Sequence, residues 1–243
     1  MFLDYRFYLF QLIVLASAVL ATFSTFGFTA LILIPLSLVL PLEQAIAISG
    51  IIDLTNGLSR GWFFKDKIDW KLVIFYGLPA IIFSFLASIV ILNIDKELLK
   101  VLLGLTLVIY GILKLSFINF SLPTNKLLLS IGGGLSGILA GLFGAGGVFR
   151  TAFLSNYKLP TAQFIATVTL IEIMVDLSRT GGYISSIPLG FDQWVLVGVS
   201  IPVSFFGVYI ASPFAKKLST NQFKNLVSVM LMIFGLLYLF KII

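Results

Sequence analysis

Acidic, basic and hydroxyl side chains recur at helical spacing inside two apolar stretches of this sequence. The two series are Thr169, Glu172, Asp176 and Arg179, and, earlier in the chain, Ser49, Asp53, Asn56 and Arg60. Spacings of three and four residues place such side chains on one face of a helix. Ionisable groups at membrane depth are costly and commonly carry function. Asp53, Glu172 and Asp176 are therefore candidates for carrying a proton.

The two series allow two interpretations. In the first, Glu172 or Asp53 carries the proton of a coupled transport cycle. In the second, Glu172 and Asp176 neutralise Arg179 or Arg150 in a structural ladder of ion pairs. In either interpretation, Arg60 and Arg179 are expected to extend their guanidinium groups to the membrane interface rather than to bind a ligand.

Two apolar segments, residues 7–41 and 127–157, are too long for one straight spanning helix, which needs about 20 residues. Each contains a break with glycine, which lets the backbone leave helical geometry: Ser24-Thr25-Phe26-Gly27 and Phe143-Gly144-Ala145-Gly146-Gly147. Helix ends inside a membrane leave N–H groups unpaired, and such groups attract anions. The predicted anion-binding residues are Ser24, Thr25, Gly27, Thr29, Gly144, Gly146, Gly147 and Arg150.

Arg150 follows the second break by three residues, in the first turn of the helix that resumes there. Its planar guanidinium could hold an oxyanion bidentately beside the N–H groups of Gly146 and Gly147. Alternatively, Glu172 or Asp176 neutralises it as a buried ion pair. Close packing of small residues against neighbouring helices is the alternative explanation for the glycines.

Helices that cross a membrane must position these residues. Hydrophobic residues make up 59% of the 243-residue chain and charged residues 11%, against roughly 45–50% and about 25% in soluble domains. The sequence therefore predicts an all-α, polytopic transmembrane protein of eight to ten helices. Its eight hydrophobic segments are residues 7–41, 44–63, 72–92, 98–118, 127–157, 161–183, 193–213 and 223–243.

The eight segments form two tandem repeats of four. At an offset of 119 residues the matched pairs include Gly27 with Gly146, Pro41 with Pro160, Asp53 with Glu172 and Arg60 with Arg179. We assign residues 1–118 to the first repeat and residues 119–243 to the second, within one membrane domain. An excess of Lys and Arg marks the cytoplasmic side of a membrane protein. The distribution of Lys and Arg in this chain favours long segments that turn back at their breaks. The two repeats would then be inverted, with both termini outside. Two repeats around a central site are a common transporter plan.

The absence of cysteine and histidine removes disulfides, Cys/His metal sites and catalysis by a nucleophile with a His base. The chain contains no Gly-x-x-x-x-Gly-Lys-Ser/Thr sequence, so energy for transport must come from a gradient or a partner. Its formal charge of +6 lies scattered between apolar runs, which fits membrane loops better than nucleic acid. We expect no enzyme activity, cofactor, metal or nucleic-acid partner. The alternatives are a membrane-embedded enzyme with a carboxylate pair such as Asp53 and Glu172, and a scaffold subunit that transports nothing.

A further set of features follows the same order along each half, with the glycine cluster complete only in the second half. They are Gly141-Leu142-Phe143-Gly144-Ala145-Gly146-Gly147, the segments led by Pro41 and Pro160, Ile68-Asp69-Trp70, and the final Leu-Val-Ile-Tyr-Gly and Leu-Met-Ile-Phe-Gly helices. In these features the sequence resembles the sulfite exporter TauE/SafE family of membrane anion permeases over nearly its whole length. It departs from the family where the first half keeps only Gly27 of the glycine cluster, and where Arg150 replaces a usually apolar residue.

The resemblance implies a secondary transporter, a permease or exporter, for a small anion such as sulfite, a sulfonate or a related sulfur-containing or organic anion. We expect it to be driven by a gradient and to reside as a multi-pass protein in the cell membrane, the inner membrane of a bacterium. The expected partners are the small anionic substrate, membrane lipid and a second copy of the chain in a homodimer.

Overall fold

The structure is a computed structural model that describes residues 5–24, 27–63, 67–115, 125–215, 229 and 232–240. All regular structure in this part of the chain is helical, which confirms the all-α prediction. Four helical stretches within it are long and apolar enough to cross a membrane: Tyr5–Thr22, Trp70–Asn93, Lys126–Phe143 and Phe191–Phe214.

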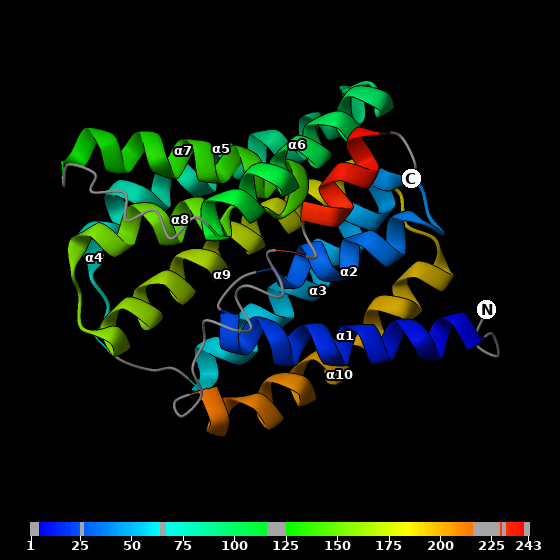
Figure 1. Cartoon of the computed structure of the whole chain (residues 1–243), viewed down its shortest axis with the longest axis horizontal. Helices are drawn as coiled ribbons and strands as arrows, with labels where there is room; N and C mark the ends of the chain where they lie inside the picture. Colours follow the sequence, from blue (N-terminus) through cyan, green and yellow to red (C-terminus); the bar gives the residue numbers. More distant parts are fainter. Residues whose placement is uncertain are drawn as a thin grey trace.

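The helices lie roughly along one common direction (Figure 1). In the first half they are α1 (Tyr5–Ser24), α2 (Phe28–Ser37), α3 (Leu42–Phe63), α4 (Trp70–Leu72), η1 (Val73–Gly77), α5 (Leu78–Val90), η2 (Ile91–Asn93) and α6 (Lys96–Leu115). In the second half they are α7 (Lys126–Phe143), α8 (Gly147–Leu154), η3 (Ser155–Tyr157), α9 (Thr161–Ser186) and α10 (Phe191–Ala215). A last helical stretch covers residues 232–239.

The first long apolar segment is a helical hairpin formed by α1 and α2. Gly27 precedes α2 with a left-handed φ of 89°, a conformation that glycine adopts without steric cost. Phe10 near the start of α1 lines the same groove as Pro35 near the end of α2. The chain therefore turns back after its first break instead of continuing across.

The second long apolar segment forms a similar hairpin from α7 and α8. Gly144 ends α7 with a φ of 71°. The Ser136 hydroxyl donates to the Gly146 carbonyl at 2.9 Å, close to the turn. Farther from the turn, a Cβ added to Gly132 would lie 2.4 Å from the Phe153 ring, so α8 runs back along α7.

Two pairs of helices, α1 with α7 and α3 with α9, run in opposite directions. α1 and α7 start at opposite ends of the molecule (Figure 1). α3 and α9 pack antiparallel, because a Cβ at Gly50 would lie 2.7 Å from the Tyr183 ring, whereas one at Gly61 would lie 3.8 Å from Cγ2 of Thr169. α1 packs on α10 of the other half, and α7 packs on α5.

The predicted straight segment 72–92 instead begins with a π-helical turn, η1, that precedes α5. Pro79 has no N–H and cannot donate to the Phe75 carbonyl four residues earlier. The Ser130 hydroxyl of α7 donates to that carbonyl at 3.0 Å. The π-helical turn thus coincides with the bond that Pro79 cannot make, and the Ser130 hydroxyl ties this turn to α7.

Candidate anion-binding site

The two glycine breaks lie against each other inside the protein. A Cβ added to Gly144, in the second break, would lie 2.2 Å from Cγ2 of Thr29, in the first turn of α2. The same Cβ would lie 2.8 Å from Nη1 of Arg179 on α9. The breaks of α1/α2 and α7/α8 therefore meet where α9 passes.

Gly144→Ala is expected to destabilise the fold, since the left-handed backbone costs a non-glycine residue about 1–2 kcal/mol and the overlap with Thr29 adds to this. The thermal unfolding midpoint of the purified protein measures the effect. Adding Thr29→Ser should recover part of the loss, because it removes Cγ2 and keeps the hydroxyl. Gly181→Ala is the control, since no atom lies within 4 Å of its Cβ position. Equal midpoints for Gly144→Ala and the control would contradict this packing.

Arg179 of α9 joins three other elements at this point. Its Nη2 contacts Oδ2 of Asp53 on α3 at 2.8 Å, and its Nε contacts Oδ1 of Asp176 at 2.9 Å. Nη2 also donates to the Thr29 hydroxyl at 3.3 Å, and Nη1 donates to the Ala140 carbonyl of α7 at 3.5 Å. Thr29 in turn donates to Asp53. The side chain is 1% exposed, so this guanidinium is fully committed to protein partners.

Glu172 lies between two other arginines. Its Oε2 contacts Nη2 of Arg60 at 2.9 Å, and its Oε1 contacts Nη2 of Arg150 at 3.1 Å. Arg60 Nε donates to Asn56 at 3.1 Å, and Asn56 donates to Ser204 of α10 at 3.2 Å. Glu172 thereby connects α3, α8 and α9.

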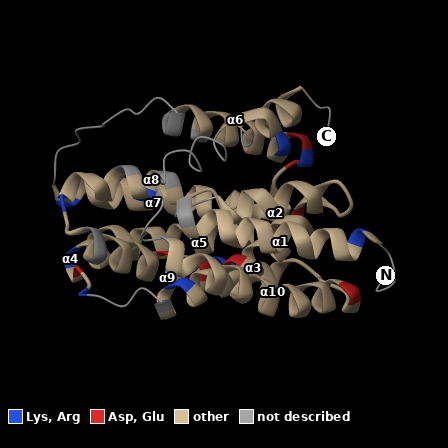
Figure 2. Ribbon diagram, turned by 60° about the horizontal axis from the view of Figure 1, so that its bottom comes forward, with Lys and Arg blue, Asp and Glu red and all other residues tan. Residues whose placement is uncertain are grey.

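The three arginines and three carboxylates balance in formal charge. The six are Asp53, Arg60, Arg150, Glu172, Asp176 and Arg179, and each is at most 6% exposed. Figure 2 shows charged residues at helix ends and an interior group where α3 and α9 cross. Burial of an unpaired charge costs several kcal/mol, and pairing offsets that cost. Three polar atoms of the group have no partner among the described residues: Asp53 Oδ1, Arg150 Nε and Asp176 Oδ2.

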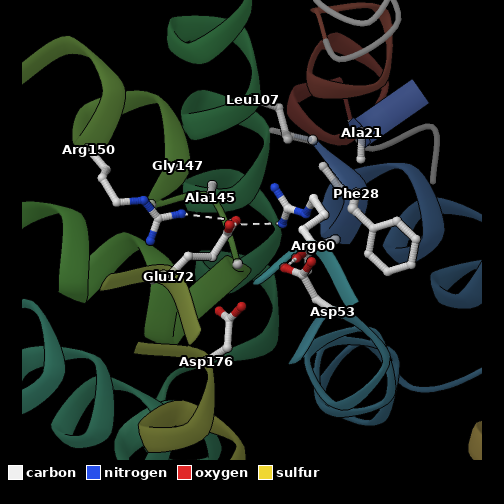
Figure 3. Close-up of a pocket in the computed structure, with 16 residues that line it drawn as sticks. Ala21, Phe28, Asp53, Arg60, Leu107, Ala145, Gly147, Arg150, Glu172 and Asp176 are labelled. Carbon is white, nitrogen blue, oxygen red and sulfur yellow. Dashed lines mark hydrogen bonds and ion pairs between the residues drawn. The ribbon is translucent and has the colours of Figure 1, made fainter. Parts of the chain in front are cut away.

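A small cavity lies beside this charged group (Figure 3). Its volume is about 20 Å³, room for about one water molecule. Its lining includes nine of the predicted site residues: Gly27, Thr29, Asp53, Gly144, Gly146, Gly147, Arg150, Glu172 and Asp176. Thr25 and the Ser24 side chain, also predicted, lie outside the described part of the structure. Arg150 contacts Glu172, as the ion-pair interpretation expects.

The predicted interfacial positions of Arg60 and Arg179 are wrong. Their residues are 5% and 1% exposed, and both guanidinium groups contact carboxylates inside the protein. Their burial follows from the crossing of α3 and α9, which brings a carboxylate of the other helix within reach of each guanidinium.

Tyr183, which is not among the residues predicted from the sequence, supports the second break. Its hydroxyl donates to the Gly141 carbonyl at 2.6 Å. The last carbonyls of a helix lack intrahelical partners, so a donor is needed near the end of α7. The available signal was its position four residues after Arg179, on the same face of α9.

The chain matches a family model and a curated relative. A family model described as Sulfite exporter TauE/SafE matches residues 9–238, a range that includes both breaks and the three arginines and three carboxylates of the buried group. A curated relative from Methanocaldococcus jannaschii, named as a probable membrane transporter protein, is 27% identical over 188 residues, which cover 71% of this chain and 69% of the relative. No solved structure matches the chain.

Proposed function

The chain belongs to the sulfite exporter TauE/SafE family, and on this premise we propose that it is a secondary transporter that moves a small anion across the membrane. The family match and the relative's name indicate a membrane transporter. The apolar helices fit a multi-pass membrane protein. The substrate is sulfite, a sulfonate or a related sulfur-containing or organic anion, and a solute gradient drives its movement.

One observation carries the choice of an anion: two buried guanidinium groups reach the same cavity from different helices. Arg60 comes from α3 and Arg150 from α8. A guanidinium presents parallel N–H donors that match an oxyanion. The first N–H groups of α8, at Gly147 and beyond, lack intrahelical acceptors and favour negative charge nearby.

We assign the substrate contacts to both breaks. The α8 side contributes Gly144, Gly146, Gly147 and Arg150, and the α2 side contributes Gly27 and Thr29, with Ser24 and Thr25 completing the first break. Asp53, Glu172 and Asp176 are the candidates for the coupling proton. The contact between Gly144 and Thr29 supports a site shared by the two breaks.

We further propose that residues 1–118 and 119–243 are inverted repeats related by a pseudo-two-fold axis. The antiparallel packing of α3 and α9 supports this. So does an exchanged set of ion pairs: Arg60 contacts Glu172, and Arg179 contacts Asp53. If Asp53 corresponds to Glu172 and Arg60 to Arg179, a two-fold rotation converts the first pair into the second. Arg150 and Asp176 then have uncharged counterparts at Leu31 and Gly57.

The return of both hairpins also supports an orientation. With both long segments folded back, most Lys and Arg residues between helices fall on the side opposite the N-terminus. Loops rich in Lys and Arg remain in the cytoplasm. We therefore place both termini outside the cell membrane, which in a bacterium is the inner membrane.

Stabilisation of the purified protein by anions tests the substrate class, because a ligand of the native state raises stability by mass action. Sulfite, thiosulfate, methanesulfonate and acetate are compared with chloride at equal ionic strength. Arg150→Gln should weaken binding about tenfold to a hundredfold, the value of hydrogen bonds to a charged group. Arg150→Lys should keep part of the affinity.

A double variant separates this function from a purely structural role of Arg150. If Arg150 only neutralises Glu172, then Arg150→Gln combined with Glu172→Gln should recover folding and bind anions as tightly as Glu172→Gln alone. The reason is that the remaining buried arginines of the group, Arg60 and Arg179, are again balanced in formal charge by Asp53 and Asp176. If Arg150 contacts the substrate, folding recovers but the double variant binds anions at least tenfold more weakly than Glu172→Gln alone. Equal affinities of these two variants would remove Arg150 from the site, and a wild-type protein that no tested anion stabilises would contradict the substrate class.

A further inference from the structure

Glu172 holds the position that best suits a bound anion. Each of its two oxygens contacts a different guanidinium, Arg60 at 2.9 Å and Arg150 at 3.1 Å (Figure 3). The two arginines come from α3 and α8, and Glu172 itself comes from α9. The carboxylate of Glu172 thus connects the two cations that would receive a substrate oxyanion.

The cavity leaves no room for a second anion beside Glu172. At about 20 Å³ it accommodates about one water molecule, and sulfite has four non-hydrogen atoms. An anion can reach both arginines only if the Glu172 side chain moves away from them.

Arg150 can gain contacts from such an exchange. Its Nη2 contacts Glu172, while its Nε has no partner among the described residues although the residue is only 4% exposed. An oxyanion that binds Nε and Nη2 together would satisfy both donors. The present ion pair leaves one buried donor unsatisfied, which costs free energy.

We propose that Glu172 is an internal competitor of the substrate: its carboxylate holds Arg60 and Arg150 in the anion-free protein, and the transported anion binds by displacing it. This inference rests on the proposed function. The displaced carboxylate would be buried without a cation and therefore takes up one proton. Each bound monoanion then brings one proton into the site, and their joint passage carries no net charge.

The other ionisable groups around Glu172 do not replace this proton. Asp53 and Arg60 face it from α3, Arg150 faces it from α8, and Asp176 and Arg179 lie on its own helix, α9. Arg179 is already held by both aspartates. On displacement of Glu172, no described arginine of the cluster remains unengaged to neutralise it.

Calorimetric titration with methanesulfonate, whose charge is constant near neutral pH, tests the proposal. Within the pH range in which binding takes up one proton, the affinity of the wild-type protein for methanesulfonate should fall about tenfold for each unit by which the pH rises. Glu172→Gln should bind at least tenfold more tightly at neutral pH and lose the pH dependence, because the competing charge is gone. The control is Glu43→Gln, another buried glutamate that pairs with a lysine, Lys96 at 3.2 Å, outside the cavity.

The result separates failure of this inference from failure of the proposed function. If wild type binds anions and Arg150→Gln weakens binding as expected, but Glu172→Gln retains wild-type affinity and pH dependence, Glu172 is no competitor and the function stands. If Glu172→Gln does not fold, titration of wild type in buffers of different ionisation enthalpy counts protons directly. About one proton per methanesulfonate is expected, and none would overturn the proposal.

Discussion

Replacement of Arg179 by glutamine is expected to lower the free energy of unfolding by about 3–5 kcal/mol, the cost of leaving buried charge without its partner. Asp53 and Asp176 would both lose their guanidinium contact, at 2.8 Å and 2.9 Å in the native protein. The change also removes a donor to Thr29 at the first break. Chemical unfolding in detergent, followed by tryptophan fluorescence, measures the loss.

Two variants make this expectation specific. Asp176→Asn added to Arg179→Gln should recover part of the stability, because one of the two uncompensated charges disappears. Lys71→Gln, which removes an exposed cation, should change stability by no more than about 0.5 kcal/mol. If Arg179→Gln and Lys71→Gln unfold at the same denaturant concentration, the buried ion pairs do not hold α3 and α9 together.

Gly137→Leu is expected to prevent folding, because α7 and α5 touch at the backbone there. A Cβ at Gly137 would lie 2.4 Å from the Ala80 carbonyl oxygen of α5. Its neighbours along α7 are equally close to backbone: a Cβ at Gly133 would lie 2.2 Å from a carbonyl oxygen of η1, and one at Gly141 would lie 2.3 Å from a carbonyl oxygen of α5. Small residues at a spacing of four allow this approach in membrane proteins. Even Gly137→Ala should cost about 1–3 kcal/mol, as overpacking does.

Gly198→Ala in α10 is the matched control for this interface. No atom lies within 4 Å of its Cβ position, and alanine favours helix over glycine by up to about 1 kcal/mol. The control should therefore unfold at the wild-type temperature or above it. A Gly137→Leu protein that remains folded and monodisperse would show that α5 and α7 do not approach as described.

The helix breaks could be predicted from sequence because their causes are local. A stretch too long to span and a glycine within it suffice to place the ends of α1 and α7. The exact geometry was not predictable: the offset of 119 residues pairs Gly27 with Gly146, whereas the left-handed conformations are at Gly27 and Gly144. The second break has one glycine that ends α7 and another that precedes α8, and the first has a single glycine for its turn.

The composition of the candidate site was predictable, but its pairing was not. Helical spacing placed Glu172 and Asp176 on the face of α9 that carries Arg179, and that face is buried. The partner of each charge depends on the antiparallel crossing of α3 and α9, which is a tertiary property. Arg60 was misplaced for the same reason, because depth in a membrane protein follows from packing and tilt rather than from distance to a helix end.

Flux of radiolabelled sulfite into proteoliposomes tests the central claim most directly. Wild-type protein should give saturable, nucleotide-independent uptake of unmodified sulfite, above that of protein-free liposomes and reduced by excess unlabelled anion, and Arg150→Gln should lose it. An enzyme would change the solute, and a scaffold would leave it outside. Uptake no greater than in protein-free liposomes for sulfite, thiosulfate, methanesulfonate and acetate alike would contradict the account.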